Sequence, residues 1–299
     1  MKIASNNIIY NKNKIKCKNF CLFLLWIALT FFPFENEEKQ FQYHQDNITI
    51  VSAYYKSKSK HKPRDYLDWI NNFVLLNKSI VFFTNKKFKP HLKRLRPKKY
   101  HDKTIFFEIE LEDFYSYSNF YNEYRKAHEI DFEKRYQTIT LYMIWAEKCS
   151  FLKKVIINNY FNSTCFYWID IGYFREKKEM EDYINNWPST KMCYDDARVL
   201  LGQVKNFSDI EKTNIINFDI ETHIRLQKNI NVIGGIFGGQ CLNLLKFINL
   251  YYNSIRLFLK NNLFIGKDQN IFTYIAFSHP EVVKLIFCKS YNEYRKYIA

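Results

Sequence analysis

The chain has 299 residues and a formal net charge of +15, from 45 Lys and Arg against 30 Asp and Glu. A charge of this sign suggests an anionic partner, but five of the lysines lie within residues 1–19, and the one dense basic run, at 86–99, is typical of a solvated loop. We therefore expect no nucleic acid partner, and the seven cysteines, which lack Cys-x-x-Cys or Cys/His ligand spacing, argue against a zinc site.

The N-terminal region combines a basic flank with an apolar segment. Residues 1–19 contain no acidic residue, and residues 20–34 are apolar apart from Thr30 and Pro33. The segment is shorter than the roughly 20 residues that usually span a bilayer. We predict a cytosolic tail at 1–19, an uncleaved type II signal anchor at 20–34 and a spacer at 35–47. A cleaved signal peptide and a buried core helix are the alternatives.

This topology places residues 48–299 in the lumen of the Golgi or the endoplasmic reticulum, as one large α/β domain. Asn-x-Ser/Thr sequons agree with a luminal location, and they begin at Asn47, Asn77, Asn162 and Asn206. Five cysteines follow the anchor, so an odd one remains unpaired or pairs between chains. A luminal partner of suitable charge is an anionic glycan, a lipid head group or a nucleotide diphosphate.

The first half of the domain alternates apolar runs with a helical pattern. Strands are predicted at 48–55, 79–84 and 104–109, and apolar residues at helical spacing predict a helix at 64–76. The alternation favours βαβ units and a mainly parallel mixed sheet.

The second half continues this pattern. Residues 138–160 contain no Gly or Pro and predict one or two helices, and 165–169 predict a central strand that ends at Asp170. Ligands of open α/β sheets bind beyond the carboxyl ends of the strands, so Asp170 is suitably placed for chemistry. Further strands are predicted at 197–204 and at 231–237, where the second ends in a glycine cluster, and further helices at 241–260 and 268–277.

Glycine is scarce, with seven residues and none before Gly172. Six of the seven fall in three motifs, which are Trp168-Ile169-Asp170-Ile171-Gly172, Gly234-Gly235-Ile236-Phe237-Gly238-Gly239 and Gly266-Lys267-Asp268-Gln269. Because glycine lets a backbone approach a ligand closely, we predict that these motifs line one pocket beside two Asp residues and that Gly202 lies outside it.

Asp170 is the candidate metal ligand. A carboxylate at the end of a strand can hold a divalent cation, Mn²⁺ or Mg²⁺, that neutralises a diphosphate. The alternative is an Asp that starts a turn completed by Gly172. An Asp-x-Asp motif would be a stronger signal, and this chain has Gly172 in place of the second Asp.

The glycine cluster fits neither a phosphate-binding loop nor the dinucleotide fingerprint. Its four glycines, Gly234, Gly235, Gly238 and Gly239, could form a backbone surface against which a sugar lies, with Phe237 as a stacking platform. The alternative is a bulge or a tight crossing of two backbones.

Asp268 and Gln269 open the last predicted helix. The carboxylate could ligate a metal, accept a hydrogen bond from a substrate hydroxyl or act as a base, and Gln269 could donate and accept at one ligand. An Asp here is more commonly a helix cap.

The remaining candidates are less specific. Arg64 and Lys148 are candidate phosphate contacts, although such charges usually face water. Trp168 is a candidate substrate contact, although a strand Trp usually packs in the core. His279 is a minor candidate in a loop.

Taken in order, the motifs resemble the HtrL/YibB-like family, which is associated in bacteria with lipopolysaccharide core genes and regarded as a glycosyltransferase group. The motifs span residues 48–287, from Thr49-Ile50-Val51-Ser52-Ala53-Tyr54-Tyr55 through Arg64-Asp65-Tyr66-Leu67-Asp68-Trp69, Val81-Phe82-Phe83-Thr84 and Trp145-Ala146-Glu147-Lys148 to the three glycine motifs. The resemblance implies a GT-A-like nucleotide-diphosphosugar fold. It also implies that Asp170 takes the Asp-x-Asp-like position, that Asp268-Gln269 is the late Asp-Gln element, and that the glycine cluster faces the sugar.

The resulting hypothesis is a membrane-anchored, hexosyltransferase-like enzyme that moves a sugar from a nucleotide-diphosphate donor to a glycan or lipid-linked acceptor. Asp268 and Gln269 are its expected catalytic residues, and Asp170 with Asp268 its expected metal ligands. The alternative is an inactive glycan- or partner-binding protein on the same fold, motivated by Gly172. A third interpretation takes the basic run at 86–99 as an anchor on anionic lipid or another polyanion.

Overall fold

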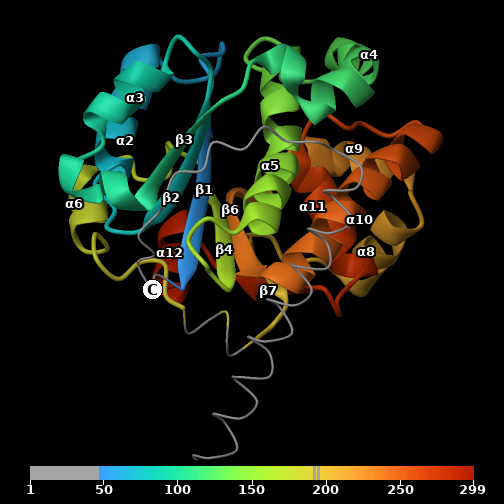
Figure 1. Cartoon of the computed structure of the whole chain (residues 1–299). Coiled ribbons are helices and arrows are strands. Elements are labelled where there is room, and N and C mark those ends of the chain that lie inside the picture. Colours follow the sequence, from blue (N-terminus) through green and yellow to red (C-terminus); the bar gives the residue numbers. More distant parts are fainter. Residues whose placement is uncertain (1–46, 191–192, 194–195) are drawn as a thin grey trace, which may run out of the picture.

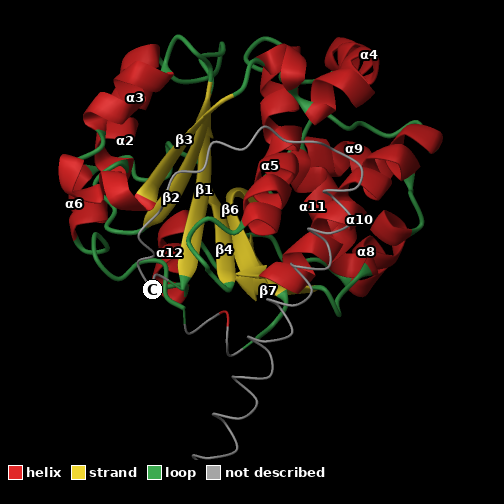
Figure 2. Cartoon of the chain, in the orientation of Figure 1, coloured by secondary structure: helices red, strands yellow, loops and turns green. Residues whose placement is uncertain are grey.

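A mixed sheet lies between two layers of helices (Figures 1 and 2) in the computed structural model, which describes residues 47–190, 193 and 196–299. The predicted tail, the anchor at 20–34 and all of the spacer except Asn47 fall outside the described residues. Within the part that is described, no helix combines the length and apolarity that crossing a membrane requires.

The strands are β1 (Ile48–Tyr54), β2 (Ser79–Thr84), β3 (Thr104–Glu108), β4 (Cys165–Ile169), β5 (Val199–Gln203), β6 (Val232–Gln240) and β7 (Val283–Phe287). The helices are α2 (Pro63–Phe73), α3 (Lys89–Leu95), α4 (Tyr115–Ile130), α5 (Ile139–Asn158), α6 (Lys177–Glu181), α8 (Asp209–Ile216), α9 (Ile220–Gln227), α10 (Cys241–Lys260), α11 (Asp268–Ser278) and α12 (Tyr291–Tyr297). Two short 3₁₀ turns lie at Lys98–Lys103 and Leu111–Asp113.

The seven strands lie in the order β3-β2-β1-β4-β6-β5-β7. Strand β6 runs antiparallel to both of its neighbours, and every other pair is parallel. The predicted mainly parallel mixed sheet is confirmed, and the one reversed strand is the one that carries the glycine cluster.

The central strands are buried on both faces, as continuous apolar runs in a covered sheet should be. Alternate residues of β1 and β2 contribute to two separate cores. Val51 and Val81 pack under α4, α5, α10 and α11, whereas Ile50 and Ile80 pack under α2 and α12. Figure 1 shows these two groups of helices on opposite sides of the sheet.

Helix α5 is one continuous helix, which settles whether residues 138–160 form one helix or two. The hydroxyl of Thr138 accepts a hydrogen bond from the backbone N–H of Leu141 and caps its start. Asn159 ends it in the left-handed conformation, with φ of 41°. The helix packs on β1 and β4 and brings Lys148 to the centre of the fold.

The prediction that a strand at 231–237 ends in the glycine cluster is wrong, because β6 continues through Gln240. A Cβ on Gly238 would lie 2.2 Å from the ring of Tyr167 and 2.6 Å from the carbonyl oxygen of Phe166. One on Gly239 would lie 2.9 Å from the carbonyl oxygen of Arg198. These two glycines therefore allow a tight crossing between strands and do not face a ligand.

Phe237 is also misassigned as a stacking platform. Its ring is fully buried and packs against Phe247 and Phe272, with ring centroids 5.6 and 5.0 Å away. A side chain enclosed by α10 and α11 has no open face for a sugar.

We expect Gly238→Ala to lower the free energy of unfolding by about 1–3 kcal/mol, because the buried Tyr167 ring has no room to move away. Chemical denaturation measures the change. Gly235→Ala is the matched control, since its nearest non-neighbouring atom, Asp170 Oδ2, is 3.3 Å away, and it should cost less. Equal stability of the two variants would contradict this explanation of the cluster.

Candidate functional site

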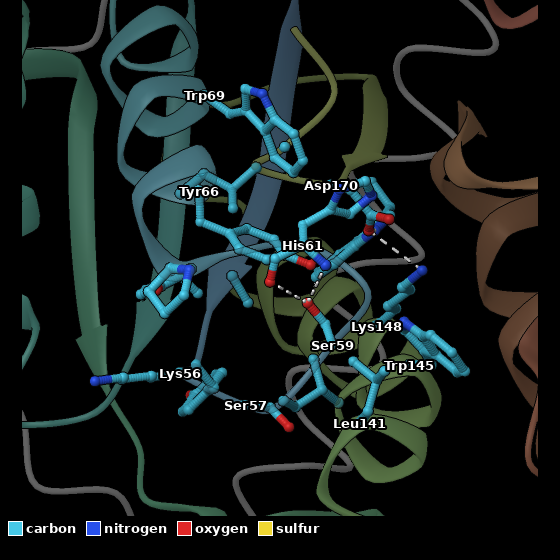
Figure 3. A pocket seen from close by; sticks show the side chains of 18 of the residues that line it. Lys56, Ser57, Ser59, His61, Tyr66, Trp69, Leu141, Trp145, Lys148 and Asp170 are labelled. Atoms are coloured by element: carbon cyan, nitrogen blue, oxygen red, sulfur yellow. Dashed lines mark hydrogen bonds and ion pairs between the residues drawn. The ribbon is translucent and has the colours of Figure 1, made fainter. Parts of the chain in front are cut away.

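The strand order places a crevice between β1 and β4. The chain moves outward from β1 to β2 and β3, and then returns to the other side of β1 as β4. Ligands of open α/β sheets bind at such a reversal, outside the carboxyl ends of the strands. The segments that follow β1 and β4 both line a cleft of about 770 Å³ and a neighbouring pocket of about 170 Å³ (Figure 3).

Asp170, the residue that follows β4, lies where the cleft and the pocket meet. The indole N–H of Trp168 donates to its Oδ1 over 2.7 Å, and its own backbone N–H donates to the carbonyl of Gly235 over 2.7 Å. Trp168 thus orients the carboxylate and β6 fixes the backbone of Asp170, while 41% of the side chain stays exposed. Trp168 is buried, and its contribution is to orient Asp170.

Lys148 is the centre of the site. Its Nζ lies 2.8 Å from Asp268 Oδ2, 3.2 Å from Asp170 Oδ1 and 3.0 Å from the carbonyl oxygen of Gly234. These acceptors match the three donors of an ammonium, and the side chain is only 3% exposed. Burial favours the neutral amine, but the two carboxylates outweigh it and raise the pKa of Lys148, so the group remains charged.

Asp268 is the first residue of α11, as predicted, but its side chain does not cap the helix. It is 5% exposed and faces Lys148. Burial raises the pKa of the Asp268 carboxyl, and the ammonium of Lys148 opposes that shift. As a metal ligand it is less accessible than Asp170, because Lys148 holds its Oδ2 and the side chain is almost fully buried. Gln269 lines the cleft beside it.

Gly234 and Gly235 let β6 approach both carboxylates. A Cβ on Gly234 would lie 3.0 Å from Asp268 Oδ1 and 3.0 Å from Gln269 Cγ, and one on Gly235 would lie 3.3 Å from Asp170 Oδ2. Both glycines line the cleft, so half of the predicted glycine surface is where the sequence predicted it.

The residues present fit a divalent cation only together with a diphosphate. Asp170 Oδ2 has no hydrogen-bond partner among the described residues, so one carboxylate oxygen is available. Nowhere in ranges 47–190 and 196–299 do three His, Cys, Asp or Glu side chains gather as a ligand set. Mg²⁺ commonly binds through one or two carboxylates plus substrate phosphates, and this arrangement suits the site.

An aromatic pocket adjoins Asp170, and the sequence reasoning missed it. His61, Tyr66 and Trp69 form edge-to-face pairs with centroids 4.8 to 6.3 Å apart, and the guanidinium of Arg175 lies 4.8 Å from the centroid of the Trp69 ring. All four side chains line the smaller pocket. The sequence feature that could have indicated them is their position shortly after the predicted strands at 48–55 and 165–169, where ligands of such sheets bind.

The Trp69 ring also explains Gly172. A Cβ at this position would lie 2.8 Å from the ring, so the second acid of an Asp-x-Asp motif has no room here without moving Trp69.

Further lining residues of the cleft come mostly from segments for which the sequence predicted no site. They are Tyr291, Asn292 and Arg295 of α12, Glu133, Lys228 and Lys267, of which Lys267 alone belongs to a predicted motif. The guanidinium of Arg295 lies over the rings of Tyr173 and Phe174, with its carbon 5.0 and 4.9 Å from their centroids.

Three further candidates lie elsewhere. Arg64 is exposed on α2 and lines neither the cleft nor the pocket, whereas Arg175 lines both. Gly266 packs against Phe264 and Tyr142, outside the predicted pocket. His279 follows α11 and lies 3.3 Å from Glu281. Gly202 packs against Ile233 and Tyr294, away from the cleft as predicted.

Comparison with known proteins gave one family match. The family model described as "Bacterial protein of unknown function (HtrL_YibB)" matches residues 47–299. Among solved structures, core-mannan synthase A (CmsA/Ktr4) from Aspergillus fumigatus in its Mn/GDP form is 12% identical over 85% of this chain and 80% of that chain, with a TM-score of 0.39. The mannosyltransferase Ktr4p from S. cerevisiae in complex with GDP is 12% identical over 94% and 78%, with a TM-score of 0.43. A search of curated proteins gave no significant match.

We expect Lys148→Met to lower the free energy of unfolding by about 3–5 kcal/mol at neutral pH, because it leaves a buried carboxylate without its counter-ion. When the pKa of a carboxyl is higher in the folded than in the unfolded state, the fold loses stability as the pH rises from the unfolded-state pKa to the folded-state pKa. Loss of Lys148 raises the pKa of Asp268 further, so the deficit should shrink between pH 8 and pH 5.

Denaturation curves at both pH values measure this effect. The control is Lys148→Met with Asp268→Asn, which removes the opposite charge too and should recover part of the stability. A deficit that is the same at both pH values, or that the second substitution does not reduce, would contradict the ion-pair explanation.

Proposed function

The chain belongs to the HtrL_YibB family, and we propose that it is a glycosyltransferase that takes a sugar from a nucleotide-diphosphate donor. The observation that carries the proposal is the position of Asp170, an exposed carboxylate held rigidly at the strand-order reversal between a cleft and an aromatic pocket. The acceptor in this proposal is a glycan or a lipid-linked saccharide.

The nucleotide occupies the smaller pocket in this proposal. His61, Tyr66 and Trp69 supply aromatic surfaces for a nucleobase, and base stacking on such side chains is worth about 1–3 kcal/mol per base. Arg175, exposed beside Trp69, supplies a positive charge for the diphosphate. This assignment puts the diphosphate between Arg175 and Asp170.

Transfer breaks the bond between the sugar C1 and the diphosphate oxygen, while the oxygen of an acceptor hydroxyl bonds to C1 and loses its proton to the departing diphosphate or to water. Negative charge develops on the departing diphosphate, where a fixed cation stabilises it most. Arg175 contributes to this stabilisation, and a Mn²⁺ or Mg²⁺ ion on Asp170 would supply the remaining Lewis-acid charge. In this proposal Lys148, itself paired with Asp268, is a positioning residue for Asp170, and Gln269 forms a hydrogen bond with the sugar.

We further propose that residues 20–34 anchor the chain with its domain in the lumen of the secretory pathway. The basic flank and the apolar segment support this topology, and the exposed sequon residues Asn162 and Asn206 are accessible for glycosylation. The full chain, expressed with microsomes, should gain N-glycans removable by endoglycosidase. An unmodified chain outside the vesicles would contradict the luminal orientation.

We expect Asp170→Asn to reduce release of nucleotide diphosphate by about 100-fold or more, because the site loses the charge that holds the cation and orients the donor. Purified full chain is incubated with a panel of nucleotide sugars, with and without Mn²⁺, and free nucleotide diphosphate is measured. Asp209→Asn, an exposed acid on α8, is the matched control and should leave release unchanged. Release unaffected by Asp170→Asn would refute the site.

Gly172 supports one competing function, a glycan-binding protein that shares the fold without the chemistry. Thermal unfolding of the same samples separates the two. Stabilisation by a nucleotide diphosphate that depends on Mn²⁺ favours the enzyme. Stabilisation by oligosaccharide alone, with no release of nucleotide, favours the binding protein.

A further inference from the structure

We propose that the end of the cleft beyond Asp268 binds the acceptor and that this acceptor is an anionic saccharide, carrying a carboxylate or a phosphate. The inference rests on the proposed transferase function, which leaves this end of the cleft free once the nucleotide fills the aromatic pocket. Lys60, Lys228, Lys267, Glu133 and Tyr136 line the cleft here, and none of them lines the smaller pocket.

The charge of the residues that line this end of the cleft indicates an anionic ligand. Three lysines face one acid, Glu133, so the wall has an excess of positive charge even when Glu133 is ionised. The neighbouring group of one ammonium, Lys148, and two carboxylates, Asp170 and Asp268, has a formal charge of −1, which lowers this excess without cancelling it. A cleft lined by one sign of charge concentrates ligands of the opposite sign.

Glu133 holds two of the lysines in place from different segments. Its carboxylate accepts hydrogen bonds from Lys60, which follows β1, and from Lys267, which precedes α11. Gln137 donates to the same carboxylate over 2.8 Å. Burial opposes ionisation of Glu133, but the hydrogen bonds from Lys267 and Lys60 outweigh it and lower its pKa.

The Lys60 and Lys267 side chains differ in how exposed they are and in how many contacts hold them. The Lys267 side chain is largely buried and also donates to the carbonyl of Gln227 over 2.6 Å. The Lys60 side chain is 54% exposed and can leave Glu133 for a ligand at little cost, since exposed ion pairs contribute little. An anionic group of the acceptor therefore competes with Glu133 for Lys60 and meets Lys228 from the other side.

Two exposed apolar side chains make this end suitable for a saccharide rather than for a free anion. Tyr136 and Ile230 line the cleft with 43% and 54% of their surface exposed. Phe132, also exposed, lies under Lys228, whose Nζ is 4.6 Å from the ring centroid. An aromatic ring beside cations can cover the apolar face of a sugar ring while the cations contact its charged group.

The site lies one residue from the ion pair at the centre of the fold. Lys267 faces Glu133, and Asp268, the next residue, faces Lys148. An acceptor held by its charged group near Lys267 therefore has its hydroxyls directed along a wall that continues to Gln269 and Asp170. This continuity makes the anionic end an acceptor subsite of the same cleft.

The test uses the full chain and three probes, which are trigalacturonate as a carboxylate, maltose 1-phosphate as a phosphate and neutral maltotriose. Titration calorimetry or ligand-observed NMR measures binding. At least one of the two anionic probes should bind more tightly than maltotriose, and its affinity should fall as the salt concentration increases. Lys60→Met with Lys228→Met should weaken anionic binding by about two- to tenfold and leave maltotriose unchanged.

Glu133→Gln gives an effect of opposite sign. It removes the competing carboxylate and should strengthen anionic binding by about two- to fivefold, an outcome that a purely structural role for Glu133 does not produce. Lys126→Met with Lys153→Met is the control, because it removes the same charge from exposed positions outside the cleft and outside the basic run at 86–99.

Binding of neither anionic probe, or equal binding of maltotriose, overturns the proposal. So does weaker binding by Glu133→Gln, or an equal loss in the Lys126 and Lys153 control. Binding of GDP and UDP is measured on the same proteins. If the lysine substitutions weaken anionic binding while neither GDP nor UDP binds, the acceptor subsite is supported and the donor assignment fails. If GDP or UDP binds while neither anionic probe does, the donor assignment is supported and the acceptor subsite fails.

Discussion

The buried ammonium of Lys148 is the interaction on which the site depends. It joins the end of β4, the backbone of β6 and the start of α11, which are separated by long stretches of chain. The buried carboxylate of Asp268, with the partly exposed carboxylate of Asp170 on the other side of the lysine, is tolerable only because this opposite charge lies beside it. In this arrangement Asp268 pairs with the lysine. Asp170 accepts a hydrogen bond from Trp168 through Oδ1, and its Oδ2 has no hydrogen-bond partner among the described residues.

The glycine cluster serves two physical requirements that a single stretch of strand meets in turn. Gly234 and Gly235 leave space for the carboxylates of Asp268 and Asp170, so β6 comes close enough for its carbonyl to bind Lys148. Gly238 and Gly239 leave space for the neighbouring strands. The first pair lines the cleft, and the second pair allows close packing between neighbouring strands. Only two of the four glycines in the cluster therefore belong to the candidate site.

Charge is distributed along the cleft in a way that suits two substrates. At its centre the two carboxylates of Asp170 and Asp268 outnumber the single ammonium of Lys148, while Arg175 lines the smaller pocket and Lys60, Lys228 and Lys267 line the cleft. An aromatic ring accompanies each group of cations, Trp69 with Arg175 and Phe132 with Lys228. We propose that the first group binds the nucleotide diphosphate and the second the anionic saccharide.

The sequence by itself determined the secondary structure around the site, since strands such as 48–55 and 165–169 and the helix at 241–260 follow from local apolar patterns that neighbouring residues fully express. It also singled out Asp170 and Asp268, which both line the cleft, and it indicated the family. Only the tertiary structure decided that Lys148 is a buried counter-ion of these acids, that Phe237 lies in the core, and that Arg175 rather than Arg64 lines the pocket. Those outcomes depend on contacts between residues as far apart as Lys148 and Asp268, and no local pattern records which distant charges will share one buried space.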